Sequence, residues 1–442
     1  MKISRYCIYE IILFHVFLVF YYYSFTNRND WKVSGLLFFL IFCLLFLEYL
    51  RTRLFVSPLF FWFAFWLGAI TIGRMNLGIG VYPLFREWSV KLLMIVLLNT
   101  LVFFWVYWLG EFSTFKKKKA ERVSKRCDNE KLADIVIAVL IVACFAFILN
   151  VIHTGVIPQL TGNANAYRSS FVATRYYQIV SVLRFSLACV PLAYKDTSSR
   201  IKKVLLILLT GAYILEEMLT GWRGYTLQGM ILLITSTLIV SGTDKKVQIR
   251  NFVLISSTVL IAVAFIIYIT VTRDGTFEVV EERVKYAVNT FYLYIAPNFL
   301  NFQTAVEKVQ PKGFLMYTAE AVWGVFLPAW ENPLYIWDDV EYNIGAFNVC
   351  TYFLEPYCDL GTAGTVIWSA VISFVSGWAF QKTTMEKNVF ALVLLGISNI
   401  TIFMLHNNFF LRSSSFLIWL ILSFFINRVS TDRVRLNGKK II

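Results

Sequence analysis

Long apolar stretches alternate with short polar ones along most of this chain. A helix needs roughly 20 apolar residues to cross the hydrocarbon core of a bilayer, and about twelve stretches approach that length. They cover approximately 6–25, 33–50, 55–72, 92–110, 132–150, 177–194, 204–219, 225–241, 251–271, 360–380, 388–406 and 413–427. The pattern predicts an all-α polytopic integral membrane protein with about twelve transmembrane helices.

Composition supports this class and excludes an ordinary soluble domain. Of 442 residues, 58% are hydrophobic and only 15% are charged, whereas soluble domains have about 45–50% apolar and about 25% charged residues. The net charge of +14 would suit a nucleic-acid partner, but the basic residues are spread over many short connections. We therefore expect no nucleic-acid partner.

The distribution of basic residues predicts the orientation of the spans. Alternate connections fall into two sets. One set, which includes both termini and the run 116–119, carries 26 of the 41 Lys and Arg residues, while the other carries 14 and Arg184 lies inside a span. Cytoplasmic loops carry an excess of Lys and Arg, so we expect both termini in the cytoplasm.

This orientation divides the chain into three parts. Residues 1–271 would hold nine spans, 272–359 would form one long periplasmic or extracellular loop, and 360–442 would hold three spans and a cytoplasmic tail. Aromatic stretches in the loop predict short helices at the membrane interface, interrupted by prolines.

For Cys350 and Cys358, which share this segment, we favour two thiols over a disulfide, because a straight helix would hold them too far apart.

The turn at 220–225 places a cation between two apolar runs. Two glycines bracket Arg223, so the chain is expected to turn tightly there. Charge is costly within a membrane and is usually paired or functional. Glu216 and Glu217 lie in the preceding apolar run, and we favour a counter-charge role for them, opposite Arg223 and Arg184, over a catalytic role.

Arginine outnumbers lysine by nine to five on the predicted outer side. The planar guanidinium grips phosphate oxygens in two places, so the set indicates a phosphate or pyrophosphate lipid as ligand. The alternative is that arginines at span ends extend to the interface. We favour that alternative for most single positions, but not for Arg223 and Arg184. The candidate pyrophosphate-binding residues are Arg223, Arg184, Arg273, Arg412 and Arg168.

A transfer reaction at this side would also need a general base. The candidates are Asp359, at the start of the tenth span, and His153 and His406, at the outer ends of the fifth and eleventh spans. Histidine titrates near neutrality, although a lone histidine at a span end is often structural.

The acidic patch at 337–341 is too weak a signal for a metal site. No motif for a nucleotide or metal is present, so we expect neither metal nor cofactor.

Two segments resemble motifs of enzymes that assemble lipid-linked bacterial polysaccharide. The Thr-Gly-Trp-Arg-Gly-Tyr turn at 220–225 resembles the Gly-Ser-Arg-Gly type turn of such polymerases and ligases. Residues 348–364 resemble the pattern, ending in Asp-Phe-Gly-x-x-Gly, that closes the long outer loop of O-antigen (Wzy) polymerases. This chain differs in having Trp222 where a small residue is common and Leu360 where Phe is common, and it has no Arg-x10-Gly motif.

The resemblance implies a metal-independent glycosyltransferase, similar to the GT-C type, in the bacterial plasma (inner) membrane. Undecaprenyl-pyrophosphate-linked oligosaccharides, of O-antigen or capsule type, would serve as donor and acceptor. Arg223 would stabilise the departing pyrophosphate, and Asp359 or His406 would act as base. Membrane lipid is an expected partner, and a chain-length regulator protein is a candidate one. The related ligase and a non-enzymatic flippase or transporter of the same lipid stay open as alternatives.

Overall fold

The computed structural model shows an all-helical chain in the part that it describes. The described ranges are 5–26, 31–75, 87–114, 129–161, 164–242, 295–311, 350–386, 388–404 and 414–430, with isolated positions between 246 and 322. Within these ranges no β-strand occurs. The helical class predicted from the apolar pattern is therefore the one observed.

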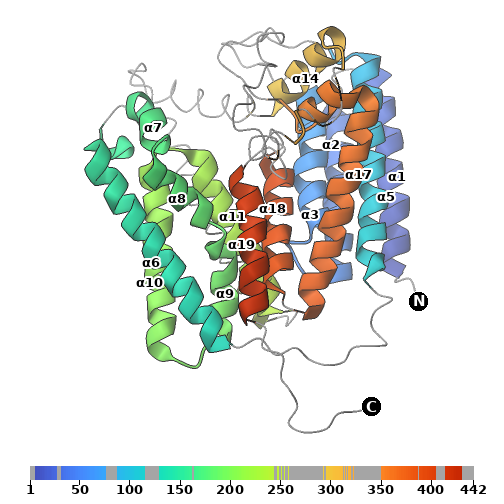
Figure 1. The fold of residues 1–442 in the computed structure, drawn as a ribbon. Coiled ribbons are helices and arrows are strands. Elements are labelled where there is room, and N and C mark those ends of the chain that lie inside the picture. The colour runs from blue at the N-terminus through green and yellow to red at the C-terminus, as the bar shows by residue number, and fades with distance from the viewer. Residues whose placement is uncertain are drawn as a thin grey trace.

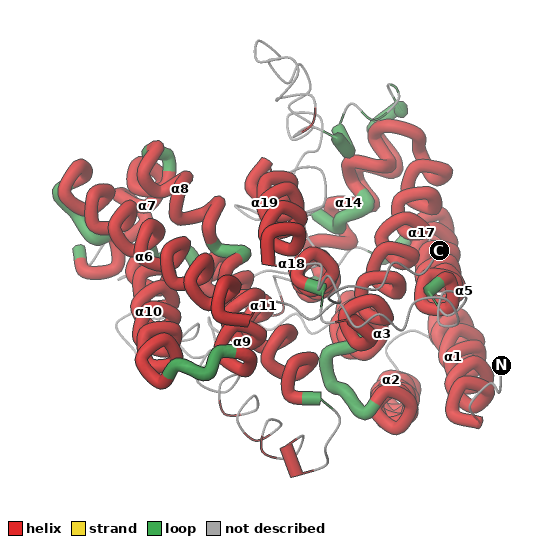
Figure 2. The backbone as a smooth tube through the Cα atoms, turned by 60° about the horizontal axis from the view of Figure 1, so that its bottom comes forward, coloured by secondary structure: helices red, strands yellow, loops and turns green. Residues whose placement is uncertain are grey.

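The helices form two groups that are joined through a helix between them (Figure 1). The first group contains α1 (Arg5–Thr26), α2 (Trp31–Thr52), α3 (Pro58–Phe61), η1 (Trp62–Leu67), α4 (Gly68–Arg74), α5 (Val90–Ser113) and α17 (Leu354–Glu386). The second contains α6 (Asn129–Thr154), η3 (Pro158–Leu160), α7 (Ala164–Val172), α8 (Arg175–Leu183), α9 (Ser186–Asp196), α10 (Arg200–Leu219) and α11 (Arg223–Ser241). Between them, α18 (Val389–Met404) packs on both α17 and α11, and α19 (Ser414–Ser430) lies beside it; Figure 2 shows the same division from another side.

Six of the described helices are long and apolar enough to cross a membrane: α1, α2, α5, α6, α11 and α17. The pair α8 and α9, bent by 46°, makes a seventh if it is one span. Three shorter apolar helices cover Pro58–Arg74, Val389–Met404 and Ser415–Ser430. The total of about twelve spans stays a prediction, because the ninth predicted span (251–271) and most of the 272–359 loop lie outside the described residues.

Three stretches predicted as spans depart from regular α-helical geometry, within the stretch or at its start. The stretch 177–194 breaks between α8 and α9, and 55–72 contains the π-helical turn η1. In α17 the backbone leaves helical geometry at Leu360 and Gly361, where Gly361 has φ 62°. Glycine adopts this left-handed region without the steric cost of a Cβ, so the residue allows the kink.

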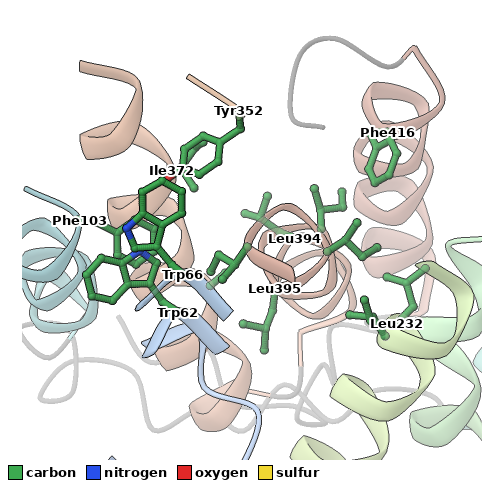
Figure 3. Packing of buried hydrophobic residues seen from close by; sticks show 14 of the residues in the cluster. Trp62, Trp66, Phe103, Leu232, Tyr352, Ile372, Leu394, Leu395 and Phe416 are labelled. Atoms are coloured by element: carbon green, nitrogen blue, oxygen red, sulfur yellow. The ribbon is translucent and has the colours of Figure 1, made fainter. Parts of the chain in front are cut away.

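Apolar side chains around α18 join the two groups (Figure 3). On one side, Trp62 of η1 stacks on Phe103 of α5 with ring centroids 4.8 Å apart. Leu394 and Leu395 of α18 lie between this cluster and Leu232 of α11. The core is therefore continuous from the first group to the second.

One helix from the predicted outer loop is described, and it lies over the end of the first group. This is α14 (Ala296–Lys308), with Pro297 in its first turn, and it overlaps the stretch 286–300 in which a short helix was expected. Its Gln303 accepts a hydrogen bond from the Ser89 amide at 3.0 Å. Lys91 of α5 donates to the Val306 carbonyl at 3.1 Å. These bonds fasten α14 to the beginning of α5.

Two glycines allow α5 and α17 to pack at unusually short range. A Cβ at Gly110 would lie 2.2 Å from the Phe374 carbonyl oxygen, and one at Gly377 would lie 2.3 Å from the Tyr107 carbonyl oxygen. Small residues at membrane helix interfaces permit such close approach of two backbones. The α5–α17 pair depends on the absence of these side chains.

We predict that Gly377→Ala destabilises the protein by about 1–3 kcal/mol, the usual cost of overpacking. The measurement is the thermal unfolding midpoint of the purified protein in detergent. Gly211→Ala in α10 is the matched control, since a Cβ there meets nothing within 4 Å, and it should be neutral or slightly stabilising. Equal midpoints for the two variants would contradict the packing argument.

Candidate functional site

Residues 220–222 join α10 to α11, and residues 223–225 of the predicted turn form the beginning of α11. Gly221 has φ 70°, a conformation typical of the residue that ends a helix. Its amide donates to the Met218 carbonyl at 3.2 Å. The Thr220 hydroxyl donates to the Glu217 carbonyl at 2.7 Å and accepts from the Trp222 amide at 3.2 Å. The turn is thus held by its own short-range bonds.

Beneath the turn, Arg184 forms a buried ion pair with Glu217. Arg184 follows the last residue of α8 and is 1% exposed. Its Nη2 and Nε donate to Glu217 Oε1 at 2.8 and 3.0 Å, and its Nη1 donates to Gln228 Oε1 at 2.8 Å. The Tyr177 hydroxyl donates to the other carboxylate oxygen, Oε2, at 3.0 Å. One set of bonds thereby connects α8, α10 and α11.

Two arginines lie against a pair of aromatic rings at the start of α11. Arg184 Cζ lies 4.5 Å from the centre of the Tyr225 ring, and Arg168 Cζ, from α7, lies 4.8 Å from that of Trp222. The two rings stack on one another with centroids 4.9 Å apart. Cations are attracted to the faces of aromatic rings. We call this set, Arg168, Trp222, Tyr225 and Arg184, the arginine–aromatic ladder.

Arg223, the central residue of the predicted site, is the first residue of α11. The structure describes its backbone position only. That position puts it next to Trp222, the helix N-cap residue, which forms no side-chain capping hydrogen bond to the described residues. A helix N-terminus carries a partial positive charge that favours anions. The ladder, Arg223 and this helix end are therefore neighbours.

Hydrogen bonds from α6 to the start of α8 support the residues beneath the ladder. Asn150 of α6 donates to the Phe171 carbonyl at 3.1 Å and accepts a hydrogen bond from the Thr174 hydroxyl. Thr174 in turn caps α8 by accepting from the Tyr177 amide at 3.1 Å. Because Tyr177 also bonds to Glu217, the polar side chain of Asn150 helps to orient the ion pair.

The adjacent glutamates have different neighbours. Glu217 faces Arg184, whereas Glu216 faces Cys144 of α6. Successive residues point in different directions on a helix with 3.6 residues per turn, so both cannot serve the same cation. The counter-charge role of Glu216 toward Arg223 stays a prediction.

Asp359 lies apart from the ladder, on α17 in the first group of helices. Its Oδ1 accepts from the Tyr317 amide at 2.9 Å. Its Oδ2 accepts from the amide and the hydroxyl of Thr318 at 2.9 and 2.5 Å. The carboxylate thus ties part of the predicted outer loop to the kink of α17, and its role as a general base stays a prediction.

Several other predicted residues have no described place. His406, Arg273, Arg412 and the acidic patch at 337–341 lie outside the described residues. His153, which does have a described place, lies in the last turn of α6 near the Tyr176 ring, with centroids 5.6 Å apart. Cys350 and Cys358 are buried and form no disulfide. Among the residues that the structure describes, no group of three His, Cys, Asp or Glu is arranged to hold a metal ion.

The sequence reasoning missed the residues that complete the ion pair, namely Tyr177, Gln228 and Asn150. A usable signal was present for two of them, because Gln228 and Asn150 are amides inside apolar runs. Such groups need partners in a membrane. Tyr177 gave no comparable signal, since tyrosine is common throughout this chain.

Comparisons of this chain with protein-family models, with curated proteins and with solved structures each find no match. The resemblance to O-antigen polymerases therefore rests on the two sequence segments. The function is argued below from those segments together with the geometry at the start of α11.

We predict that Glu217→Ala destabilises the protein by about 3–5 kcal/mol, because it leaves the Arg184 charge buried without its partner. The double variant Arg184→Met, Glu217→Leu should recover much of that stability, since apolar side chains can replace a buried ion pair. Thermal unfolding of purified protein in detergent measures both. A double variant as unstable as Glu217→Ala would contradict the pairing argument.

Proposed function

We propose that this protein polymerises undecaprenyl-pyrophosphate-linked oligosaccharide repeat units at the outer face of the plasma membrane. The observation that carries the proposal is that Arg168 and the backbone of Arg223 both lie at the start of α11. There Arg168 lies on Trp222, and Arg223 begins the helix. The same residues, 220–225, form the segment that resembles polysaccharide polymerases and ligases.

Arg223 and Arg168 are the proposed ligands of the pyrophosphate. A guanidinium fork fits two phosphate oxygens at once, and the N-terminus of α11 adds its partial positive charge. These charges would stabilise the leaving pyrophosphate as it develops negative charge, an electrostatic effect that is large when the donors are preorganised.

Arg184 has a different part in the proposal. Its charge is balanced by Glu217, and its guanidinium is buried against Tyr225. A cation that is already paired contributes little net attraction for a second anion. We therefore assign Arg184 to positioning: it sets the orientation of Tyr225, which stacks on Trp222, the residue that precedes Arg223.

The reaction also needs a base that takes a proton from the acceptor hydroxyl. Asp359 and His406 are the two candidates. Asp359 already accepts three hydrogen bonds from Tyr317 and Thr318, so in the proposal it also holds the segment that covers the substrates. Holding donor and acceptor in line contributes through positioning.

We predict that Arg223→Ala abolishes polymer formation while the protein still inserts in the membrane. Arg223→Lys should also be impaired, because a point charge does not replace the planar fork. Chain lengths of the surface polysaccharide on gels give the readout. Arg175→Ala, at the exposed first residue of α8, is the control and should leave chain lengths normal. Normal chains in Arg223→Ala would refute the role of this residue.

A deletion strain distinguishes the proposed polymerase from the related ligase. Loss of a polymerase should leave single repeat units attached to the final acceptor, whereas loss of a ligase should remove them altogether. Purified protein that lengthens lipid-linked repeat units in detergent would exclude a transporter. Failure to lengthen them, together with complete loss of attached units in the strain, would overturn the polymerase proposal.

A further inference from the structure

A second charged cluster lies far from the ladder, near the end of the molecule where α1 begins (Figure 1). It is formed by Glu10 of α1, Glu48 and Arg51 of α2, and Glu111 of α5. Glu10 and Glu48 have fully buried side chains, and those of Arg51 and Glu111 are only 7% and 8% exposed. Three carboxyl groups therefore surround one guanidinium out of contact with water.

Arg51 gives its hydrogen bonds to two of the three carboxyl groups. Its Nε and Nη2 donate to the two oxygens of Glu48 at 2.6 and 2.8 Å. Its Nη1 donates to the two oxygens of Glu111 at 2.7 and 3.0 Å. Glu48 also accepts a hydrogen bond from the Ser57 hydroxyl. The Glu10 carboxyl approaches Arg51 Nε only to 3.5 Å.

Two buried polar groups of the cluster lack partners in the described part of the chain. Neither oxygen of Glu10 accepts a hydrogen bond from a described donor, although the residue is 0% exposed and its carboxyl group lies beside that of Glu48. The Tyr107 hydroxyl, which faces Arg51, Glu48 and Glu111, also makes none. A buried polar atom without a partner carries the full cost of its desolvation. These groups indicate that a ligand belongs in the cluster.

Charge balance shows what kind of ligand is needed. If every group were ionised, three carboxylates and one guanidinium would leave two uncompensated negative charges in a buried site. Buried charge costs several kcal/mol per ion unless it is paired, and adjacent carboxyl groups relieve this by sharing a proton. Among the described residues Arg51 is the one positive group of the cluster, so a positive ligand would balance the remaining charge.

We propose that the Glu10–Glu48 pair is a proton-binding site. Glu10 takes one proton from water and, as a neutral carboxylic acid, donates its O–H to a carboxylate oxygen of Glu48. This supplies the missing hydrogen bond at Glu10 and lowers the buried negative charge by one. The proposal does not depend on the function proposed above.

A proton fits the cluster better than a metal ion does. A metal ion beside Glu10 would lie close to the guanidinium of Arg51, which repels it. A proton shared between two carboxyl oxygens avoids this, because it needs no further ligands. The described residues also contain no group of three His, Cys, Asp or Glu arranged to hold a metal.

The groups that face the pair come from each helix packed around it. Helix α2 presents Arg51 beside Glu48, α5 presents Tyr107 and Glu111, and Ser57 at the start of α3 presents its hydroxyl. Helix α17 approaches this part of α5 with Gly377, which has no side chain. On α1 itself, Cys7 lies one turn before Glu10. Arg51 is thus the one positive group among those named.

The contact between α1 and α2 should depend on whether the Glu10–Glu48 pair holds its proton. Loss of the proton would place two carboxylates side by side between α1 and α2, which pack along one another. Repulsion would then weaken that contact. The unfolded state releases the proton at about pH 4.3, the ordinary pKa of glutamate, whereas the folded state holds it to higher pH. Between these two values only the folded state binds the proton, so stability should fall as pH rises and should level off once the folded state has lost the proton.

The test is the thermal unfolding midpoint of the purified protein in detergent as a function of pH. For the wild type we expect the midpoint to drop by several degrees as pH rises above the ordinary pKa of glutamate, about 4.3, and to level off once alkaline pH has removed the proton. Glu10→Gln imitates the neutral carboxyl and should lose that dependence. Glu386→Gln, an exposed residue paired with Lys382, is the control and should behave as the wild type does. Infrared spectra should show a protonated-carboxyl band in the wild type that Glu10→Gln lacks.

The proposal is overturned if Glu10→Gln keeps both the infrared band and the pH dependence. It is also overturned if sodium chloride, but not choline chloride, restores the wild-type midpoint at alkaline pH, since the ligand is then a metal cation. Should Glu10→Gln not fold, Glu10→Asp replaces it. This variant keeps a titratable carboxyl and must show the same fall at a displaced pH, and an unchanged curve overturns the proposal.

Discussion

A guanidinium buried in a membrane protein needs its counter-charge in the same place, and the helices that carry the two groups are then held together. Arg184 and Glu217 form such a pair, and it holds together helices of the second group. Gln228 and Tyr177 satisfy the remaining atoms of the pair. Because these residues belong to α8, α10 and α11, the ion pair fixes the start of α11 and thereby the arginine–aromatic ladder. Every argument about the 220–225 turn depends on that bond.

Buried charge must be balanced in both charged clusters, but the two clusters differ in how far their own side chains balance it. Around Arg184 one carboxylate balances one guanidinium, and the site is satisfied within the protein. Around Arg51 the carboxyl groups outnumber the guanidinium by three to one. The first cluster therefore serves to position a turn, whereas in the second the described residues supply one guanidinium for three carboxyl groups. The α5–α17 glycine contact lies beside the second cluster, so close packing and unbalanced charge occur together there.

The apolar pattern predicted helix positions well where a helix is straight. The stretch 6–25 corresponds to α1, and 225–241 corresponds to α11, with ends that differ by at most two residues. It failed where polar partners bend the chain. The stretch 177–194 reads as one continuous apolar run, yet the chain bends by 46° between α8 and α9. Arg184, with its bonds to Glu217 and Gln228, lies at this break.

Hydrophobicity and its spacing are local properties, so the sequence by itself determined the helical class, most helix positions and the break in the chain at Gly221, whereas Arg223 and Gly224, predicted in the turn, belong to α11. The pairing of charges is not local. Glu217 and Arg184 are 33 residues apart, and Arg51 and Glu111 are 60 apart. Only the tertiary structure decided that Glu217 faces Arg184 while Glu216 faces Cys144, and that Glu10 joins Arg51. Those choices depend on how helices distant in the chain pack, and burial then makes each choice costly to change.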